Sequence, residues 1–218
     1  MSVKHTDSVE KVASYLKAAN ADEVVLSSKF FRDYTCPSGC GGCCPKFTLD
    51  YVEGPRLDKL RATYPEAAAR LKPRQTKTGH TIWTDAQSDN DTRWCRHLRQ
   101  EDGRCGIHEA NPFTCEFELL KLNVTQGKGR IINKLFGRGW SLLRVDGERG
   151  AKCEMLPYDG SKLTRDVALL DELRDWAPVL GYDEGVLPRV VGWLKKHALR
   201  LQKERPAAVT FRNRITRG

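Results

Sequence analysis

The chain has 218 residues, of which 39% are hydrophobic and 8% aromatic, so it can bury the core of one domain or of two small ones. No apolar run approaches the roughly 18 residues of a membrane span, and the N-terminus lacks the apolar core of a signal peptide. These absences predict a cytoplasmic protein without a membrane partner. The formal charge of +9 is uneven, because Lys195–Gly218 carries eight basic residues against Glu204 alone, which is +7.

The first predicted element is a short amphipathic helix. Its start is indicated by a capping box formed by Asp7 and Glu10, and its apolar face by Val9, Val12, Ala13 and Leu16. Glu23–Tyr34 favours a strand that enters the loop Cys36–Pro45, where three glycines and two prolines exclude regular structure. Leu49–Leu71 is predicted to be mostly helical with a break near Pro65, and Thr78–Thr84 to be a short strand.

Further along, Arg130–Phe136 is a predicted strand, and Gly127–Arg130 is more typical of a hairpin turn than of a phosphate-binding loop. Helical spacing then extends over Leu163–Leu180 and Val190–Leu201. The basic end after Pro206 is the one low-complexity candidate.

These elements predict an α+β fold with a small, loop-rich metal-binding core that cysteine loops close. We expect residues 1–160 to form this core with its N-terminal helix. Residues 161–218 are predicted to form a helical part with a basic tail, packed on the core as one domain.

The strongest signal is the set of eight cysteines, because thiols clustered in a glycine loop of an intracellular protein are typical of metal sites. A short loop of small residues lets several thiolates converge while backbone amides turn toward the sulfurs. Eight thiolates suffice for two four-thiolate sites, or for one cluster and a second ion, and soft ligands suit both zinc and iron. The candidate ligands are Cys36, Cys40, Cys43, Cys44, Cys95, Cys105, Cys115 and Cys153.

The pattern Cys36-x3-Cys40-x2-Cys43-Cys44, then Cys95, then Cys105-Gly-Ile-His-x3-Pro-x2-Cys115, resembles the YkgJ-type cysteine-cluster family of zinc- or iron-chelating domains. Cys153 is similar to its last cysteine. The resemblance implies metal binding, and a relative, the flagellin lysine N-methylase, implies a methyl-transferring enzyme. Where such families usually have two arginines, this chain has Asn111 and Glu116. The resemblance therefore does not imply that these two positions bind a charged substrate.

The triplet Cys36-x3-Cys40-x2-Cys43 also resembles the one by which radical S-adenosylmethionine enzymes hold a four-iron cluster. The match is incomplete, since Gly42 stands at the usual aromatic position and Cys44 is able to close the open iron. Without repeated strand–helix units, 218 residues do not form the usual partial barrel.

From these patterns we expect an iron–sulfur enzyme with a 4Fe-4S cluster that modifies a macromolecule, with S-adenosylmethionine as the donor of a methyl or other group. A non-enzymatic zinc module that binds nucleic acid or protein is the first alternative, and a metal carrier or electron-transfer protein is the second. The patterns identify no catalytic residue. His97 and His108 are further candidate ligands or hydrogen-bond donors near the cysteines, and equally candidate structural residues.

The expected partner is a nucleic acid, because arginines bind phosphates and an aromatic side chain such as Phe211 can stack on an unpaired base. A protein lysine is the alternative substrate. The candidate nucleic-acid-binding residues are Lys195, Lys196, Arg200, Arg212, Arg214 and Arg217.

Overall fold

A computed structural model of the chain describes residues 8–28, 30–31, 33–35, 48–85, 95–99, 101–117, 120–125, 128–133, 154–156 and 158–213. Contacts divide these residues into two compact units. The first contains residues 48–85, 95–99 and 101–117, and the second begins in the N-terminal helix at Val12 and includes residues 158–213. None of the described helices is long and apolar enough to cross a membrane.

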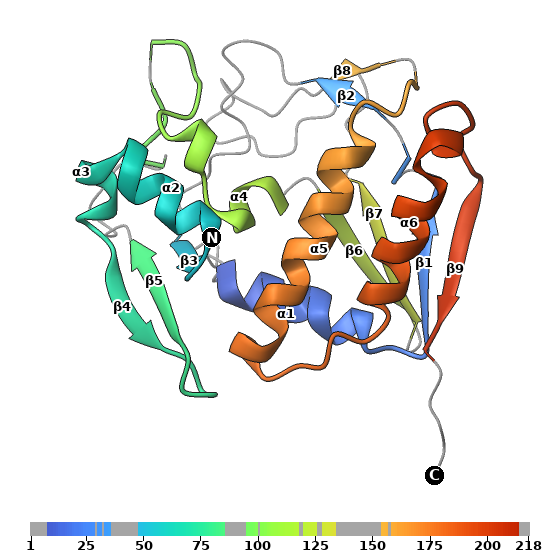
Figure 1. Cartoon of the computed structure of the whole chain (residues 1–218), viewed down its shortest axis with the longest axis horizontal. Coiled ribbons are helices and arrows are strands. Elements are labelled where there is room, and N and C mark those ends of the chain that lie inside the picture. The colour runs from blue at the N-terminus through green and yellow to red at the C-terminus, as the bar shows by residue number, and fades with distance from the viewer. Residues whose placement is uncertain are drawn as a thin grey trace, which may run out of the picture. The chain divides into compact units, whose positions relative to one another are not determined.

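The first unit is built on a three-stranded antiparallel sheet in the order β3-β5-β4 (Figure 1). Its strands are β3 (Leu49–Val52), β4 (Lys72–Gln75) and β5 (Thr81–Asp85). Between β3 and β4 the chain forms α2 (Pro55–Thr63) and α3 (Pro65–Ala68), and each begins with a proline, which suits a first helical turn. Beyond β5 lie a 3-10 helix, η1 (His108–Ala110), and α4 (Phe113–Phe117).

The core of the first unit lies between β3 and α2. Leu49 and Tyr51 of β3 are buried, and so are Leu57 and Leu60 of α2, which lie three positions apart on one helix face. Leu71, Cys95, Ile107 and Ala110 belong to the same buried cluster. The loop that carries the later cysteines is therefore part of this core.

The second unit contains a four-stranded sheet in the order β6-β7-β1-β9. Its strands are β1 (Glu23–Ser27), β6 (Leu120–Thr125), β7 (Lys128–Asn133) and β9 (Ala208–Arg212). β1 pairs in parallel with β7 and antiparallel with β9, and β6 and β7 form an antiparallel pair. A separate two-stranded sheet joins β2 (Tyr34–Thr35) to β8 (Glu154–Met155).

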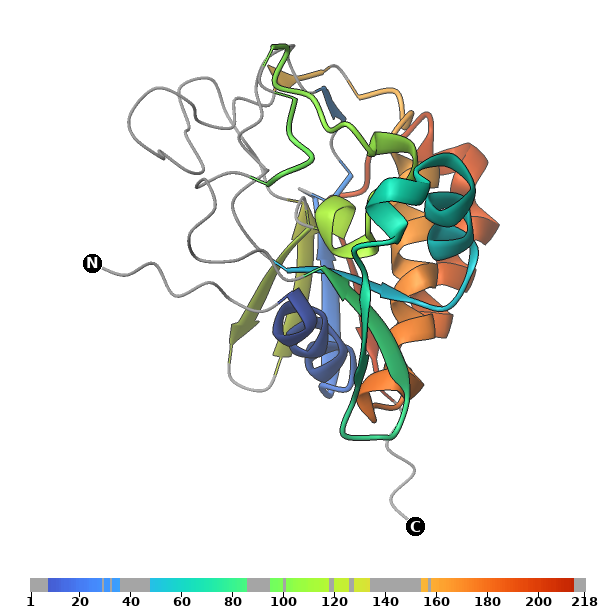
Figure 2. The ribbon, with the colours of Figure 1, turned by 90° about the vertical axis from the view of Figure 1, so that its left-hand side faces the viewer.

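Three helices accompany this sheet: α1 (Ser8–Ala19), α5 (Leu163–Leu180) and α6 (Leu187–Leu201). Figures 1 and 2 show α5 and α6 side by side against one face of the sheet. Val24 and Phe211 are register partners on β1 and β9, both are buried, and the Phe211 ring meets Trp193 of α6 edge to face at 6.0 Å. The core of this unit therefore lies between these helices and the sheet.

The α+β class is confirmed, and the predicted helices at the start of the chain, at 163–180 and at 190–201 are present. Three local predictions are wrong. Residues 49–52 form a strand instead of a helix, the strand predicted over 23–34 ends at Ser27, and residues 208–212 form β9 instead of a tail. The domain boundary at residue 160 stays a prediction.

Candidate metal centre

A tight backbone hairpin brings Cys95 and Cys105 together. Leu98 and Cys105 form an isolated antiparallel bridge. The Leu98 N–H donates to the Cys95 carbonyl at 2.9 Å, and the Gly106 N–H donates to the His97 carbonyl at 2.6 Å. A β-carbon at Gly106 would lie 3.2 Å from the His97 carbonyl oxygen, so this close approach favours a glycine.

The tip of this hairpin is closed by Asp102 and Gly103. The Asp102 carboxylate accepts a hydrogen bond from the Arg104 N–H at 3.0 Å, and also pairs with Arg99. Gly103 has a φ of +65°, a conformation that other residues rarely adopt. The Asp-Gly pair therefore sets the turn that aligns the two cysteine-bearing arms.

Two short turns then return the chain from Cys105 to Cys115. The Ala110 N–H donates to the Ile107 carbonyl at 3.0 Å in η1, and the Cys115 N–H donates to the Pro112 carbonyl at 3.0 Å in α4. Cys95 is buried and Cys105 and Cys115 are half-buried, and all three are thiols instead of disulfides.

Tyr51 of β3 belongs to the same hydrophobic cluster as these three cysteines. The tyrosine is 2% exposed, and its hydroxyl donates to the Ala110 carbonyl at 2.9 Å. Burial raises the pKa of Tyr51 far above its ordinary value, and negative charge on Cys115, Cys105 and Cys95 raises it further. Tyr51 and Cys95 are buried in one hydrophobic cluster, and Cys105 and Cys115 pack against it.

The thiols lie in an apolar cluster, and the backbone of Ile107 forms a hydrogen bond to the Cys105 sulfur. Burial raises the pKa of the Cys105 thiol, and a nearby charge on Cys95 adds to this effect. A hydrogen bond from the Ile107 N–H to the Cys105 sulfur acts in the opposite direction. Such a donor stabilises a thiolate, which is the form that binds metal.

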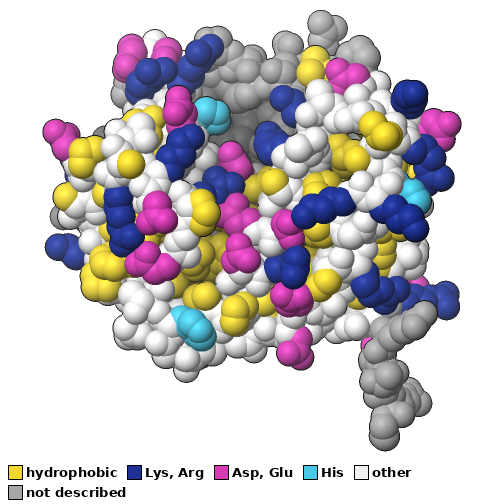
Figure 3. Space-filling view, viewed as in Figure 1, with side chains coloured by type: hydrophobic (Ala, Val, Ile, Leu, Met, Phe, Trp, Pro, Cys, Tyr) yellow, Lys and Arg dark blue, Asp and Glu magenta, His cyan; other side chains and the backbone are white. Residues whose placement is uncertain are grey.

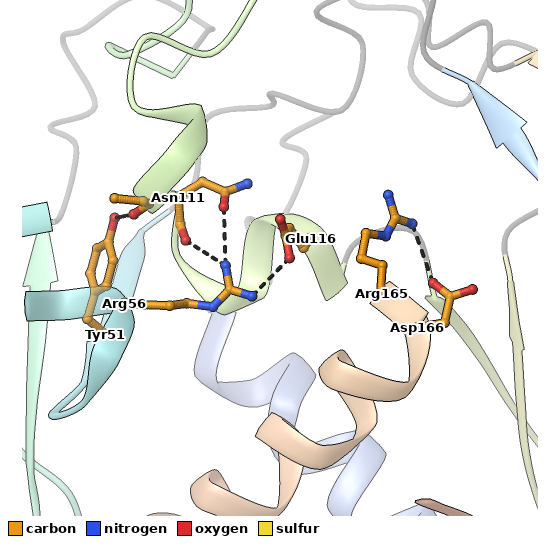
Figure 4. A network of polar contacts seen from close by, with 7 residues as sticks. Tyr51, Arg56, Asn111, Glu116, Arg165 and Asp166 are labelled. Carbon is orange, nitrogen blue, oxygen red and sulfur yellow. Dashed lines mark hydrogen bonds and ion pairs between the residues drawn. The ribbon is translucent and has the colours of Figure 1, made fainter. Parts of the chain in front are cut away.

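The guanidinium of Arg56, from α2, spans both sides of the Cys115 turn (Figure 4). Its Nη1 donates to the carbonyl oxygen and the Oδ1 of Asn111 at 3.0 and 3.2 Å, and its Nη2 donates to Glu116 at 2.9 Å. Asn111 is buried and Glu116 is half-buried. Asn111 and Glu116, at which the resemblance implies arginines, therefore both bind Arg56 here.

Residues 35–131 match the family model CxxCxxCC, which is described as a putative zinc- or iron-chelating domain. We call these residues the CxxCxxCC segment. The match confirms the resemblance drawn from the cysteine spacing and supports metal binding by the CxxCxxCC segment. Comparison with curated proteins and with solved structures gives no match.

The described part of the CxxCxxCC segment fits a thiolate-bound metal. It supplies three soft donors in an apolar cluster, and the buried Thr114 hydroxyl beside Cys115 has no hydrogen-bond partner among the described residues. Among these residues, no three His, Cys, Asp or Glu side chains gather closely enough to hold an ion by themselves. The three thiols are thus a candidate part of the metal centre.

The other predicted ligands of the CxxCxxCC segment, Cys36, Cys40, Cys43 and Cys44, lie outside the described residues, and so does Cys153. The histidines of the segment have other surroundings. His97 Nε2 lies 3.8 Å from the buried carboxylate of Asp85, and the side chain of His108 is exposed.

The basic residues predicted to bind nucleic acid differ in their surroundings. Lys195 pairs with Asp171 at 2.7 Å, and Arg212 lies 3.7 Å from Glu23. Lys196 and Arg200 are exposed on α6, and Arg214 and Arg217 lie outside the described residues.

The prediction that Phe211 stacks on a base is wrong for the folded chain. Phe211 is 6% exposed, and its ring packs against Trp193. The aromatic side chain among the basic residues therefore belongs to the hydrophobic core. β-pairing with β1 places it there, since residues of one strand alternate between two faces.

Sequence reasoning missed Tyr51 and Arg56. Both come from a segment predicted to be helical, about 40 residues before Cys95, and neither belongs to the cysteine spacing. The burial of Tyr51 and the reach of Arg56 to Asn111 arise from tertiary packing. No short-range pattern indicates either contact.

Proposed function

We propose that the chain is a metal-cluster enzyme, that cysteine thiolates of the CxxCxxCC segment bind the cluster, and that a nucleic acid is the substrate. The observation that carries the metal-binding part is that Cys95, Cys105 and Cys115 share one hydrophobic cluster with Tyr51. Their positions in one apolar cluster favour a shared centre. Isolated buried cysteines have no reason to converge in this way.

For the metal we propose iron, in a four-iron cluster. Support comes from the triplet Cys36-x3-Cys40-x2-Cys43, whose spacing resembles that of cluster-binding enzymes. The Ile107 N–H directed at the Cys105 sulfur is a second support, because hydrogen bonds to sulfur tune such clusters. Zinc bound by four thiolates is the rival, since thiolates suit both metals.

Anaerobic purification followed by absorption spectroscopy and analysis of iron, sulfide and zinc tests this choice. We expect a coloured protein with iron and sulfide in equal amounts, and loss of both in Cys105→Ser and Cys115→Ser. Ala67→Ser is the matched control, because Ala67 packs against the same cluster and carries no thiol. A colourless protein with stoichiometric zinc and no sulfide would replace the iron proposal by the zinc one.

The proposed nucleic-acid partner is supported by a basic stripe on α6. Arg189, Lys196 and Arg200 lie seven and four residues apart on one face of α6, Arg189 donates to the carbonyl of Arg212, and Lys203 follows the end of the helix at Leu201. All four are exposed, and Figure 3 shows Lys and Arg side chains gathered over this part of the surface. Such a stripe suits a phosphate backbone.

The salt dependence of binding tests this partner. Replacing Lys196, Arg200 and Lys203 by Gln should weaken DNA or RNA binding and reduce the slope of log affinity against log salt by about 2 to 3. The matched control replaces Arg70, Lys72 and Lys77, three exposed basic residues of the first unit. Equal losses in both variants would indicate nonspecific charge, and an unchanged slope in the α6 variant would exclude the stripe.

The reaction that we propose is transfer of a methyl or other group from S-adenosylmethionine. Its support is the sequence alone: the triplet Cys36-x3-Cys40-x2-Cys43 resembles the one that leaves one iron of a four-iron cluster open, and the reaction requires that no further thiolate, Cys44 included, bind that iron. Calorimetry with the cluster-replete protein provides the test. Absence of S-adenosylmethionine binding would remove methyl transfer from the proposal and leave the metal centre standing.

A further inference from the structure

The turn that joins Cys105 to Cys115 is held at its middle by two side chains from an earlier segment. The Tyr51 hydroxyl donates to the Ala110 carbonyl at 2.9 Å. The Arg56 guanidinium donates to the carbonyl oxygen of the next residue, Asn111, at 3.0 Å. Two consecutive carbonyl groups between the cysteines are therefore anchored to β3 and α2.

Arg56 also reaches the other end of this turn. Its Nη2 donates to Glu116 at 2.9 Å, and Glu116 directly follows Cys115. One planar guanidinium thus binds the backbone before Pro112 and the side chain after Cys115 (Figure 4). A rigid fork fixes the distance between these points, which the single ammonium of a lysine does not.

Neither side chain is suited to bind a metal itself. The Tyr51 hydroxyl donates its hydrogen bond to the Ala110 carbonyl, and a guanidinium is always protonated in proteins. The contacts instead resemble the outer hydrogen bonds that orient metal ligands, whose removal typically lowers metal affinity about 10- to 100-fold.

We propose that Tyr51 and Arg56 are positioning residues of the metal centre, which set the separation of Cys105 and Cys115 through the backbone of residues 110–116. This inference rests on the proposed metal centre. It differs from a general contribution to stability, because it requires that metal binding change more than folding does.

Cobalt(II) titration of the metal-free protein separates the two roles, since sulfur-to-cobalt absorption reports how many thiolates bind. The variants are Tyr51→Phe, which keeps the ring, Arg56→Gln, and Arg56→Lys, which keeps the charge. We expect each to lower cobalt affinity about 10- to 100-fold and to weaken the absorption band. Thermal melting of the metal-free variants shows how much folding changes.

Matched controls come from the same segment. Arg61, like Arg56, lies on α2, and Arg61→Gln breaks its ion pair with Glu53 at 3.1 Å. Tyr64→Phe removes the hydroxyl of a tyrosine that packs against the same cluster. Both controls should bind cobalt within about twofold of the wild type.

Three outcomes would overturn the inference. Wild-type affinity and absorption in Tyr51→Phe and Arg56→Gln would do so, even if melting falls, because the contacts would then serve only the fold. Equal losses of cobalt affinity in the two control variants would also overturn the inference, because the effect would then not depend on Tyr51 and Arg56. If the wild type and Cys115→Ser take up cobalt alike, the proposed metal centre itself fails and the inference fails with it.

Discussion

The carboxylate of Asp33 accepts a hydrogen bond from the backbone N–H of Gly160 at 3.0 Å. The same side chain accepts from the N–H of Asp159 at 2.7 Å and from that of Lys162 at 3.1 Å. Lys162 directly precedes α5, and no side chain of its own caps that helix. Asp33 therefore caps α5 from a distant part of the chain.

Replacing Asp33 should destabilise the second unit. Asp33 is 2% exposed, so Asp33→Ala leaves several amide donors near the start of α5 without an acceptor. We expect a loss of about 2–4 kcal/mol in the free energy of unfolding, measured by urea denaturation. The exposed Asp22→Asn, as a control, should change it by less than about 0.5 kcal/mol. A loss no larger than the control's would show that the cap is dispensable.

Two glycines of the second unit should respond oppositely to alanine. Gly185 has a φ of +59°, and a β-carbon there would lie 2.6 Å from the carbonyl carbon of Ala19, so Gly185→Ala should cost about 3 kcal/mol or more. Gly192 lies inside α6 with nothing within 4 Å of its added β-carbon. Gly192→Ala should stabilise by up to about 1 kcal/mol. Thermal melting of both variants checks the sign, and equal shifts would contradict the prediction.

Acid should weaken the contact between α5 and α6. A hydrogen bond from Lys195 at 2.7 Å, followed by one from Arg174, lowers the pKa of Asp171 below its ordinary value. Its stabilising contribution is therefore complete above the unfolded pKa, near pH 4, and is lost as pH falls through the lower folded pKa.

Urea unfolding of Asp171→Asn at pH 7 and at pH 3 checks this dependence. The difference in stability between variant and wild type should shrink at the lower pH. The exposed Glu66→Gln serves as the control. A difference that stays constant or grows on acidification would contradict the assigned direction.

Metal removal should lower the melting temperature. A ligand that binds only the folded state stabilises it by about 4 kcal/mol at 1,000 times its dissociation constant. We therefore expect chelation, or Cys40→Ser, to lower the melting temperature of the purified protein. Unchanged melting in a verified metal-free sample would contradict a metal coupled to folding.

Local patterns predicted α5 well and β9 not at all. Residues 163–180 carry a helical apolar stripe that ends at Gly181, whose φ of +74° is the common helix terminus. In β9, exposed positions alternate with Val209 and Phe211, but five residues are too few to outweigh the basic neighbours. Pairing with β1, far away in sequence, determines this strand.

The candidate site likewise has a part that local sequence predicts and a part that depends on tertiary packing. Cysteine spacing is a local property, so the CxxCxxCC match and the set of possible ligands could be predicted. The four residues of β3 were predicted as part of a helix because the helix formers that follow dominate the pattern. The hydrogen bonds of Tyr51 and Arg56 join segments about 55 to 60 residues apart, which no periodicity encodes.

The position of β1 in its sheet has a consequence for biosynthesis. The ribosome releases Glu23–Ser27 before the parallel partner, which begins at Lys128, and before the antiparallel partner, which begins at Ala208. Until both partners are synthesised, the edges of β1 lack them, and its backbone N–H and C=O groups remain open to pairing with other chains. Residues 48–117 leave the ribosome before either partner strand, so the cysteines of this region can acquire metal while the second sheet is still incomplete.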